Sequence, residues 1–179
     1  MYTPPTSLGT HYLQISIQNF KDLKSLADKA LAQIQPEDYH WKPDSESNSL
    51  AILMQHLAGN MLSRWTDFLT SDGEKITRNR DHEFMDSRPA IESLKELWEK
   101  GWTCFLDTLS TLTEADLLKT VTIRAEPHSV LQAINRQLTH YGYHIGQIVY
   151  LCKHLNSEHW KSLSIPRGKS TDFVTKKPS

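Results

Sequence analysis

The sequence predicts an all-α protein, a four-helix bundle, and three observations lead to that prediction. Four segments of the 179-residue chain repeat apolar residues every three or four positions, which is the spacing of a helix with one buried face. The chain contains no internal repeat and no convincing pattern for a sheet. Amphipathic helices of this length bury their apolar faces best against one another.

The first two predicted helices are separated by a polar loop. Apolar residues at helical spacing predict a first helix over residues 8–34. It ends before Pro36, because the residue that precedes a proline disfavours the helical conformation. Asn48 or Ser49 can cap the second helix, which is expected to run to about Thr70.

A long connection is predicted between the second and third helices. Residues 71–88 contain a Ser-Asp-Gly turn and the charged segment Arg78–Phe84, and we expect them to form an exposed connection. Such a length permits a crossover topology. The third helix is predicted to open at Pro89 and to end near Ser110.

The last part of the chain combines a short extended piece with a fourth helix. Residues 121–124 alternate and are rich in β-branched side chains, which favours a strand, but the sequence offers no obvious partner for it. Ser129 can cap a helix to about Leu155. We therefore expect one domain over residues 1–179, with a core of about 8–155 and an irregular tail of about 160–179.

Composition limits the partners that the chain can have. Its net charge is −1, from 20 Lys plus Arg against 21 Asp plus Glu, so no general field attracts nucleic acid or an anionic membrane. The two cysteines lie among apolar residues and suggest buried thiols in a reducing compartment. The first nine residues lack the basic-then-apolar pattern of a secretory signal peptide. The apolar stretches are far shorter than the roughly 20 residues of a membrane span. We expect a cytoplasmic protein that binds neither nucleic acid nor membranes.

Three of the nine histidines are candidate metal ligands. His140 and His144 are one helical turn apart, roughly 40° around the axis, so both imidazoles can face one point. His56 falls at the margin of the apolar face of the second helix and can supply a third ligand. Three protein ligands leave coordination positions open. The alternative is that His56 forms a hydrogen bond in the core and that the other two belong to an ordinary polar flank.

The surroundings of these histidines resemble a known superfamily. His56 in Leu-Met-Gln-His-Leu-Ala, followed much later by His140-Tyr-Gly-Tyr-His144-Ile-Gly-Gln147, is similar to the DinB and YfiT-like metal-binding four-helix bundles. The likeness covers nearly the whole chain, and segments 71–75 and 164–168 resemble one uncharacterised bacterial branch. It implies that His56, His140 and His144 bind one divalent metal ion, nickel, zinc, iron or manganese. Frequent homodimers are implied as well.

The resemblance also implies a function. It points to a metal-dependent enzyme of the thiol-transferase kind, which would bind a low-molecular-weight thiol as its small-molecule substrate. Metal-dependent hydrolysis is a second interpretation. A third is a non-catalytic binding or stress-response protein in which the metal only joins two helices, and a fourth protein ligand would favour it.

Charged residues of the long connection are weaker candidates. If that segment folds over the cleft, His82 or Glu83 could supply a fourth ligand or a general base, although charged residues in loops are usually solvated. Three arginines could hold a carboxylate or the anionic group of a thiol cofactor by paired hydrogen bonds. They are Arg78, Arg80 and Arg136, of which Arg136 is the best candidate.

Other residues of the last helix complete the set of candidates. Gln147 is close enough to His144 to orient its imidazole, although a plain surface amide is an equal alternative. Gly142 and Gly146 lower helix propensity, which indicates close approach of another helix or of a ligand.

Overall fold

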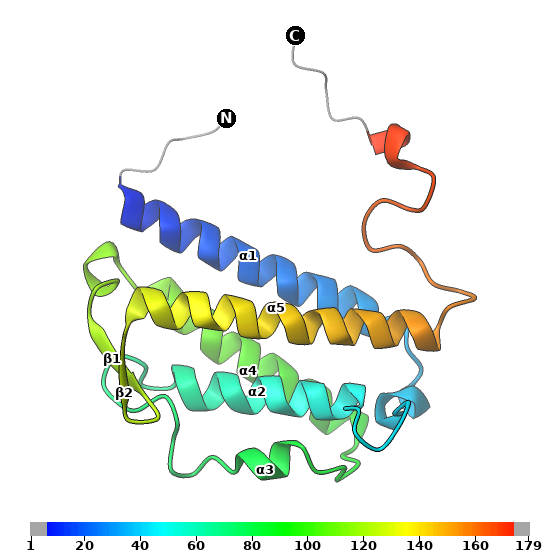
Figure 1. Ribbon diagram of the computed structural model, residues 1–179, viewed down its shortest axis with the longest axis horizontal. Coiled ribbons are helices and arrows are strands. Elements are labelled where there is room, and N and C mark those ends of the chain that lie inside the picture. Colours follow the sequence, from blue (N-terminus) through cyan, green and yellow to red (C-terminus); the bar gives the residue numbers. More distant parts are fainter. Residues whose placement is uncertain (1–6, 174–179) are drawn as a thin grey trace.

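Four long helices and a small β-hairpin form the computed structural model, which describes residues 7–173 (Figure 1). The long helices are α1 (Leu8–Leu31), α2 (Leu50–Trp65), α4 (Ile91–Thr111) and α5 (Val130–Leu155). The short elements are η1 (Pro36–His40), α3 (Arg80–Glu83), η2 (Glu114–Asp116), β1 (Thr120–Ile123), β2 (Glu126–Ser129) and η3 (Ser170–Phe173). The protein is therefore mostly helical, as the apolar spacing predicts.

The long helices pack mainly as two pairs, α1 with α5 and α2 with α4. Helix α5 also contacts α2, and Figure 1 shows it between α1 and α2. Buried aromatic rings join the pairs: Phe20 lies 4.5 Å from Phe105, and Phe105 lies 5.2 Å from Tyr141, measured between ring centroids. Between residues 7 and 173, no helix combines the length and the apolar character that a membrane crossing requires.

The predicted helix starts are confirmed at two capping serines, whereas the first and second helices end earlier than predicted. The first helix ends at Leu31 instead of residue 34. The Ser49 and Ser129 hydroxyls accept hydrogen bonds from the N–H groups of the third residue beyond each. The second predicted helix, however, ends at Trp65 instead of Thr70. It stops because Thr66 is extended and Asp67 has a φ of 51°, which no helix can continue.

The extended piece near residue 121 has a partner strand that the sequence does not predict. Strand β1 pairs with β2 in antiparallel register, from Thr120 opposite Ser129 to Ile123 opposite Glu126. The two-residue turn between them is Arg124-Ala125, with φ values of 57° and 61°. Such turns usually contain Asn-Gly or Asp-Gly, so this one carries no recognisable signal.

The connection between α2 and α4 is not simply exposed, and that prediction is corrected. It forms the short helix α3, which lies beside α2 in Figure 1. The side chains of Arg78 and Glu83 are only 4% and 10% exposed. Gly59 on α2 allows this approach, because a Cβ atom there would collide with the Glu83 carboxylate. Two charged side chains of the segment Arg78–Phe84 are therefore buried beside the helix that carries His56.

After α5, the described part of the chain contains no regular element except the short turn of η3. Trp160 packs against the edge of the core, and residues 161–172 are largely exposed. The remaining residues of the predicted tail, 174–179, lie outside the described residues.

Candidate metal centre

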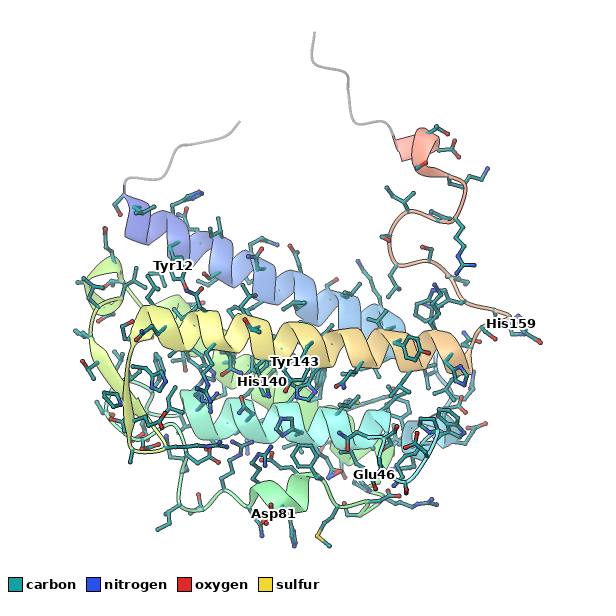
Figure 2. All side chains as sticks on the ribbon, viewed as in Figure 1. Tyr12, Glu46, Asp81, His140, Tyr143 and His159 are labelled. Atoms are coloured by element: carbon teal, nitrogen blue, oxygen red, sulfur yellow. The ribbon has the colours of Figure 1, made fainter. Side chains whose placement is uncertain are left out.

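The three histidines singled out by their spacing lie together in the structure. Helix α2 presents His56, and α5 presents His140 and His144 from successive turns. One nitrogen of each ring lies within 4.8 Å of the corresponding nitrogens of the other two. The Nε2 atoms of His56 and His140 are 3.1 Å apart. Figure 2 shows His140 in the space between α5 and α2.

This arrangement fits a single metal ion. Imidazole nitrogens bind divalent ions at about 2.1 Å, which places the nitrogens of one coordination sphere roughly 3 to 4 Å apart. The observed separations need only small side-chain adjustments to reach that range. Among the described residues the group contains these three histidines and no cysteine or carboxylate, so three of the four or more positions around an ion would be filled.

The electrostatics of the site favour neutral imidazoles, which is the form that binds metals. Burial, together with the nearby His144, His56, Arg64 and Arg78, lowers the pKa of His140 from 6.5 to about 3. Burial also lowers the pKa of His144 to about 4, against a hydrogen bond with Gln147 that acts in the opposite direction. Both rings therefore stay uncharged at neutral pH.

Glu83 orients the imidazole of His56. Nδ1 of His56 donates a hydrogen bond of 2.9 Å to Oε2 of Glu83. The carboxylate is held in turn by Arg78, which donates to both of its oxygens at 2.7 Å. Burial raises the pKa of Glu83, but the hydrogen bonds from His56 and Arg78 outweigh this effect and keep it below the ordinary value. Nε2 of His56 is thus turned toward the other histidines.

A second chain of hydrogen bonds reaches His140. Arg64 can only donate, and its Nη1 donates to Oε1 of Gln137 at 2.9 Å, which fixes the amide. Nε2 of Gln137 then donates to Asn60 at 2.9 Å and to Nδ1 of His140 at 3.1 Å. His140 consequently carries its proton on Nε2 and donates it to Nε2 of His56.

Gln147 and Tyr143 contact the third histidine. Nδ1 of His144 donates to Oε1 of Gln147 at 2.8 Å, which leaves Nε2 of His144 with a free electron pair. The Tyr143 ring lies 4.1 Å from the His144 ring, and Figure 2 shows Tyr143 close to His140. The expected contact between Gln147 and His144 is therefore present.

Some of the remaining candidates lie at the site and one does not. Glu83 forms hydrogen bonds with His56 and Arg78 and lies outside the ligand group. His82 is exposed and lies outside that group. Arg136 lines the same cavity as the histidines.

Three polar residues that support the site were not predicted from the sequence. Asn60 and Arg64 follow His56 by one and two turns on α2, and Gln137 precedes His140 by about one turn on α5. All three are at most 4% exposed. Polar side chains at positions where the periodicity demands apolar ones were the signal that could have identified them.

The histidines open into a cavity of about 370 Å³ between α2, α5, α3 and the β-hairpin. Its lining combines the imidazoles with arginine, asparagine and aromatic side chains. None of the described residues that line it is an aspartate or glutamate. A small ligand can therefore reach the ligand nitrogens from this side.

The chain matches a known protein family. Residues 7–169 match the model of a family described as a protein of unknown function (DUF1572). The matched range includes all five α-helices and the three histidines. A comparison with curated proteins found no match.

Proposed function

We propose that this chain, which belongs to the DUF1572 family of proteins of unknown function, is a metal-dependent enzyme with one divalent ion on His56, His140 and His144. The observation that carries the proposal is the convergence of three imidazoles, from two helices, at the wall of an accessible cavity. Three imidazoles suit nickel, zinc, iron or manganese.

The proposed architecture is the DinB-like four-helix bundle. The pairing of α1 with α5 and of α2 with α4 supports it, as does the position of the histidines on the facing helices α2 and α5. A fourth protein ligand would favour the non-catalytic alternative. In the described chain the ligand group has three members, which favours an open, catalytic site.

When bound, the ion would act as a Lewis acid that holds a small donor group of the substrate and lowers its pKa. The protein's own residues orient the ligands and shape access. Glu83 and Arg78 fix the ring of His56, and Gln147 fixes that of His144. Helix α3 and its flanking residues cover one side of the cavity.

The preferred reaction is transfer of a thiol to an electrophile. A thiol has an ordinary pKa of about 8.5, whereas water has one of about 15.7, so a thiol needs far less help to lose its proton. Among the described residues, the lining of the cavity holds no carboxylate that could serve as a base, and Glu83 is already hydrogen-bonded to Arg78. The sulfur would bond to the electrophilic carbon, the leaving group would take the electron pair of the broken bond, and the thiol proton would pass to solvent.

The experiment uses untagged protein that has been stripped with a chelator and reloaded separately with zinc, nickel, iron(II) or manganese. Thiol transfer is measured as the fluorescence gained when glutathione or cysteine reacts with monochlorobimane, above the rate with the free metal. We expect metal to restore the activity in the wild type. His144→Ala should lose it, and the control His159→Ala should keep it, because His159 is exposed and outside the site.

Two results would redirect or overturn the proposal. Metal-dependent cleavage of 4-nitrophenyl acetate without thiol transfer would replace the transferase by the hydrolase. Activity that survives both chelation and His144→Ala, or no metal-dependent activity in either assay, would contradict the proposed enzyme.

A further inference from the structure

Arginine is concentrated around the candidate metal centre. Five of the seven arginines in the sequence line the one cavity that the three histidines share. They come from α2, α3 and its preceding segment, the β-hairpin and α5, and are Arg64, Arg78, Arg80, Arg124 and Arg136. The chain as a whole has a net charge of −1, so this is a local feature and not the consequence of a basic protein.

Only two of these arginines are neutralised by the protein. Arg78 pairs with Glu83 at 2.7 Å and with Glu74 at 3.1 Å, and Arg124 pairs with Glu74 at 3.3 Å. Within residues 7–173, Arg64, Arg80 and Arg136 have no carboxylate oxygen within 4.0 Å. The cavity therefore carries an excess of positive charge.

Arg64 is the clearest sign of a missing partner. It is 3% exposed, yet its only hydrogen bond within the described chain is the one from Nη1 to the neutral amide of Gln137. Its Nε is buried and has no hydrogen-bond partner among residues 7–173. Burial, and the positive charges of Arg136 and Arg78, lower the pKa of Arg64. A buried charge is normally paired, because leaving it unpaired is costly.

The other two arginines stand where they can complete a binding site. Arg80 lies over the ring of Phe84, with its guanidinium carbon 5.1 Å from the ring centroid. The Phe84 ring is in turn 4.6 Å from that of His56, which ties Arg80 to the candidate metal centre. Arg136 projects from α5, one turn before His140.

We infer that Arg64, Arg80 and Arg136 form a subsite for the anionic group, a carboxylate or a phosphate, of the small molecule that enters this cavity. Guanidinium groups hold such anions by paired hydrogen bonds, which lysine cannot do. The volume of about 370 Å³ suits a small molecule. The assignment of this anion to the substrate rests on the proposed function, which then implies a thiol substrate that carries an acidic group. The anion site itself does not require the metal.

The test is an anion titration of metal-free protein by isothermal calorimetry. Inorganic phosphate and succinate are titrated separately in chelator, at constant ionic strength set with chloride, so that the two arms distinguish phosphate from carboxylate. We expect saturable binding of at least one of them with one equivalent. Arg136→Ala and Arg80→Ala, both at exposed positions, should each weaken it about tenfold, which corresponds to one lost charge-assisted contact.

Arg64→Met keeps an unbranched apolar stem, removes the buried guanidinium and should abolish binding, with circular dichroism to show that the variant is folded. Arg167→Ala, an exposed arginine outside the cavity, is the matched control and should bind like the wild type. Failure of both anions to bind, or equal binding in wild type, Arg80→Ala and Arg136→Ala, would overturn the inference. Metal content is measured on separate, unstripped samples, so loss of the metal site alone would contradict the proposed function and leave the anion site standing.

Discussion

The Oε2 atom of Glu83 lies 2.9 Å from Nδ1 of His56, so the connection between α2 and α4 reaches the back of the candidate metal centre. Both side chains are almost completely buried there, at 4% exposed for His56 and 10% for Glu83. A carboxylate behind an imidazole fixes the ring and increases the basicity of the nitrogen that faces the ion.

Glu83→Ala should therefore weaken metal binding about 10- to 100-fold while all three ligands remain. Competition with a metal-sensitive chelator dye gives the dissociation constant. Asp81→Ala is the matched control, because Asp81 is exposed on the same short helix (Figure 2) and should leave the affinity unchanged. Equal affinities for wild type and Glu83→Ala would show that this contact does not act on the metal.

Substitution of Gln137 is expected to increase the affinity for the metal. Coordination through Nε2 of His140 moves that ring's proton to Nδ1, which faces the donating Nε2 of Gln137. Gln137→Glu replaces this donor by a carboxylate, which can accept from both His140 and Arg64. We expect tighter metal binding, by roughly tenfold, in the same dye competition. Unchanged or weaker affinity in a folded variant would show that Nε2 of His140 is not the ligand atom.

The depressed pKa values of His140 and His144 predict how stability depends on pH without metal. In the unfolded chain these groups take up protons near their ordinary value of 6.5, whereas in the folded protein they do so only near pH 3 and 4. Between these limits the unfolded state binds more protons, so stability is complete above about pH 6.5 and falls as the pH falls.

Urea unfolding at pH 7 and pH 5, in the presence of chelator, measures this effect. The double variant His140→Gln and His144→Gln should lose less stability between the two pH values than the wild type, because it lacks both groups. Equal losses in the two proteins would contradict the depressed pKa values.

Replacement of two helical glycines by alanine is expected to change stability in opposite directions. A Cβ atom on Gly101 of α4 would lie 2.9 Å from Cα of Ala58, where α4 crosses α2. Gly101→Ala should reduce the free energy of unfolding by about 1 to 3 kcal/mol through overpacking. A Cβ atom on Gly142 meets no atom within 4 Å, so Gly142→Ala should increase it by about 0.5 to 1 kcal/mol through helix propensity. Thermal or urea unfolding checks both signs.

Much of the fold could be predicted because its signals are local. Periodic apolar residues and capping serines such as Ser49 and Ser129 act within a few residues of one another, and the long helices follow from them. The β-hairpin could not be predicted, because its turn is held from a distance. The Asp72 carboxylate accepts hydrogen bonds of 2.9 and 2.8 Å from the N–H groups of Arg124 and Ala125, about 50 residues away in the chain.

The candidate site shows the same division. The spacing of His140 and His144 already placed two imidazoles on one side of a helix. His56 joins them because its helix packs beside that one. The burial of Arg78 and Glu83 depended on how the connection packs against Gly59, which no local pattern reports. The close packing expected at Gly142 and Gly146 was wrong within the described chain, since neither glycine has a neighbour in the way of a Cβ atom.

Measurement of the metal content tests the three-histidine site most directly. Untagged protein is purified without chelator and analysed by plasma mass spectrometry as wild type, His140→Ala, His144→Ala and the exposed control His159→Ala. The three-histidine site predicts about one equivalent of one divalent metal in wild type and control, and less than about a tenth of an equivalent in the two site variants. Metal-free wild type whose melting temperature does not change when zinc, nickel, iron(II) or manganese is added, or site variants that keep a full equivalent, would contradict it.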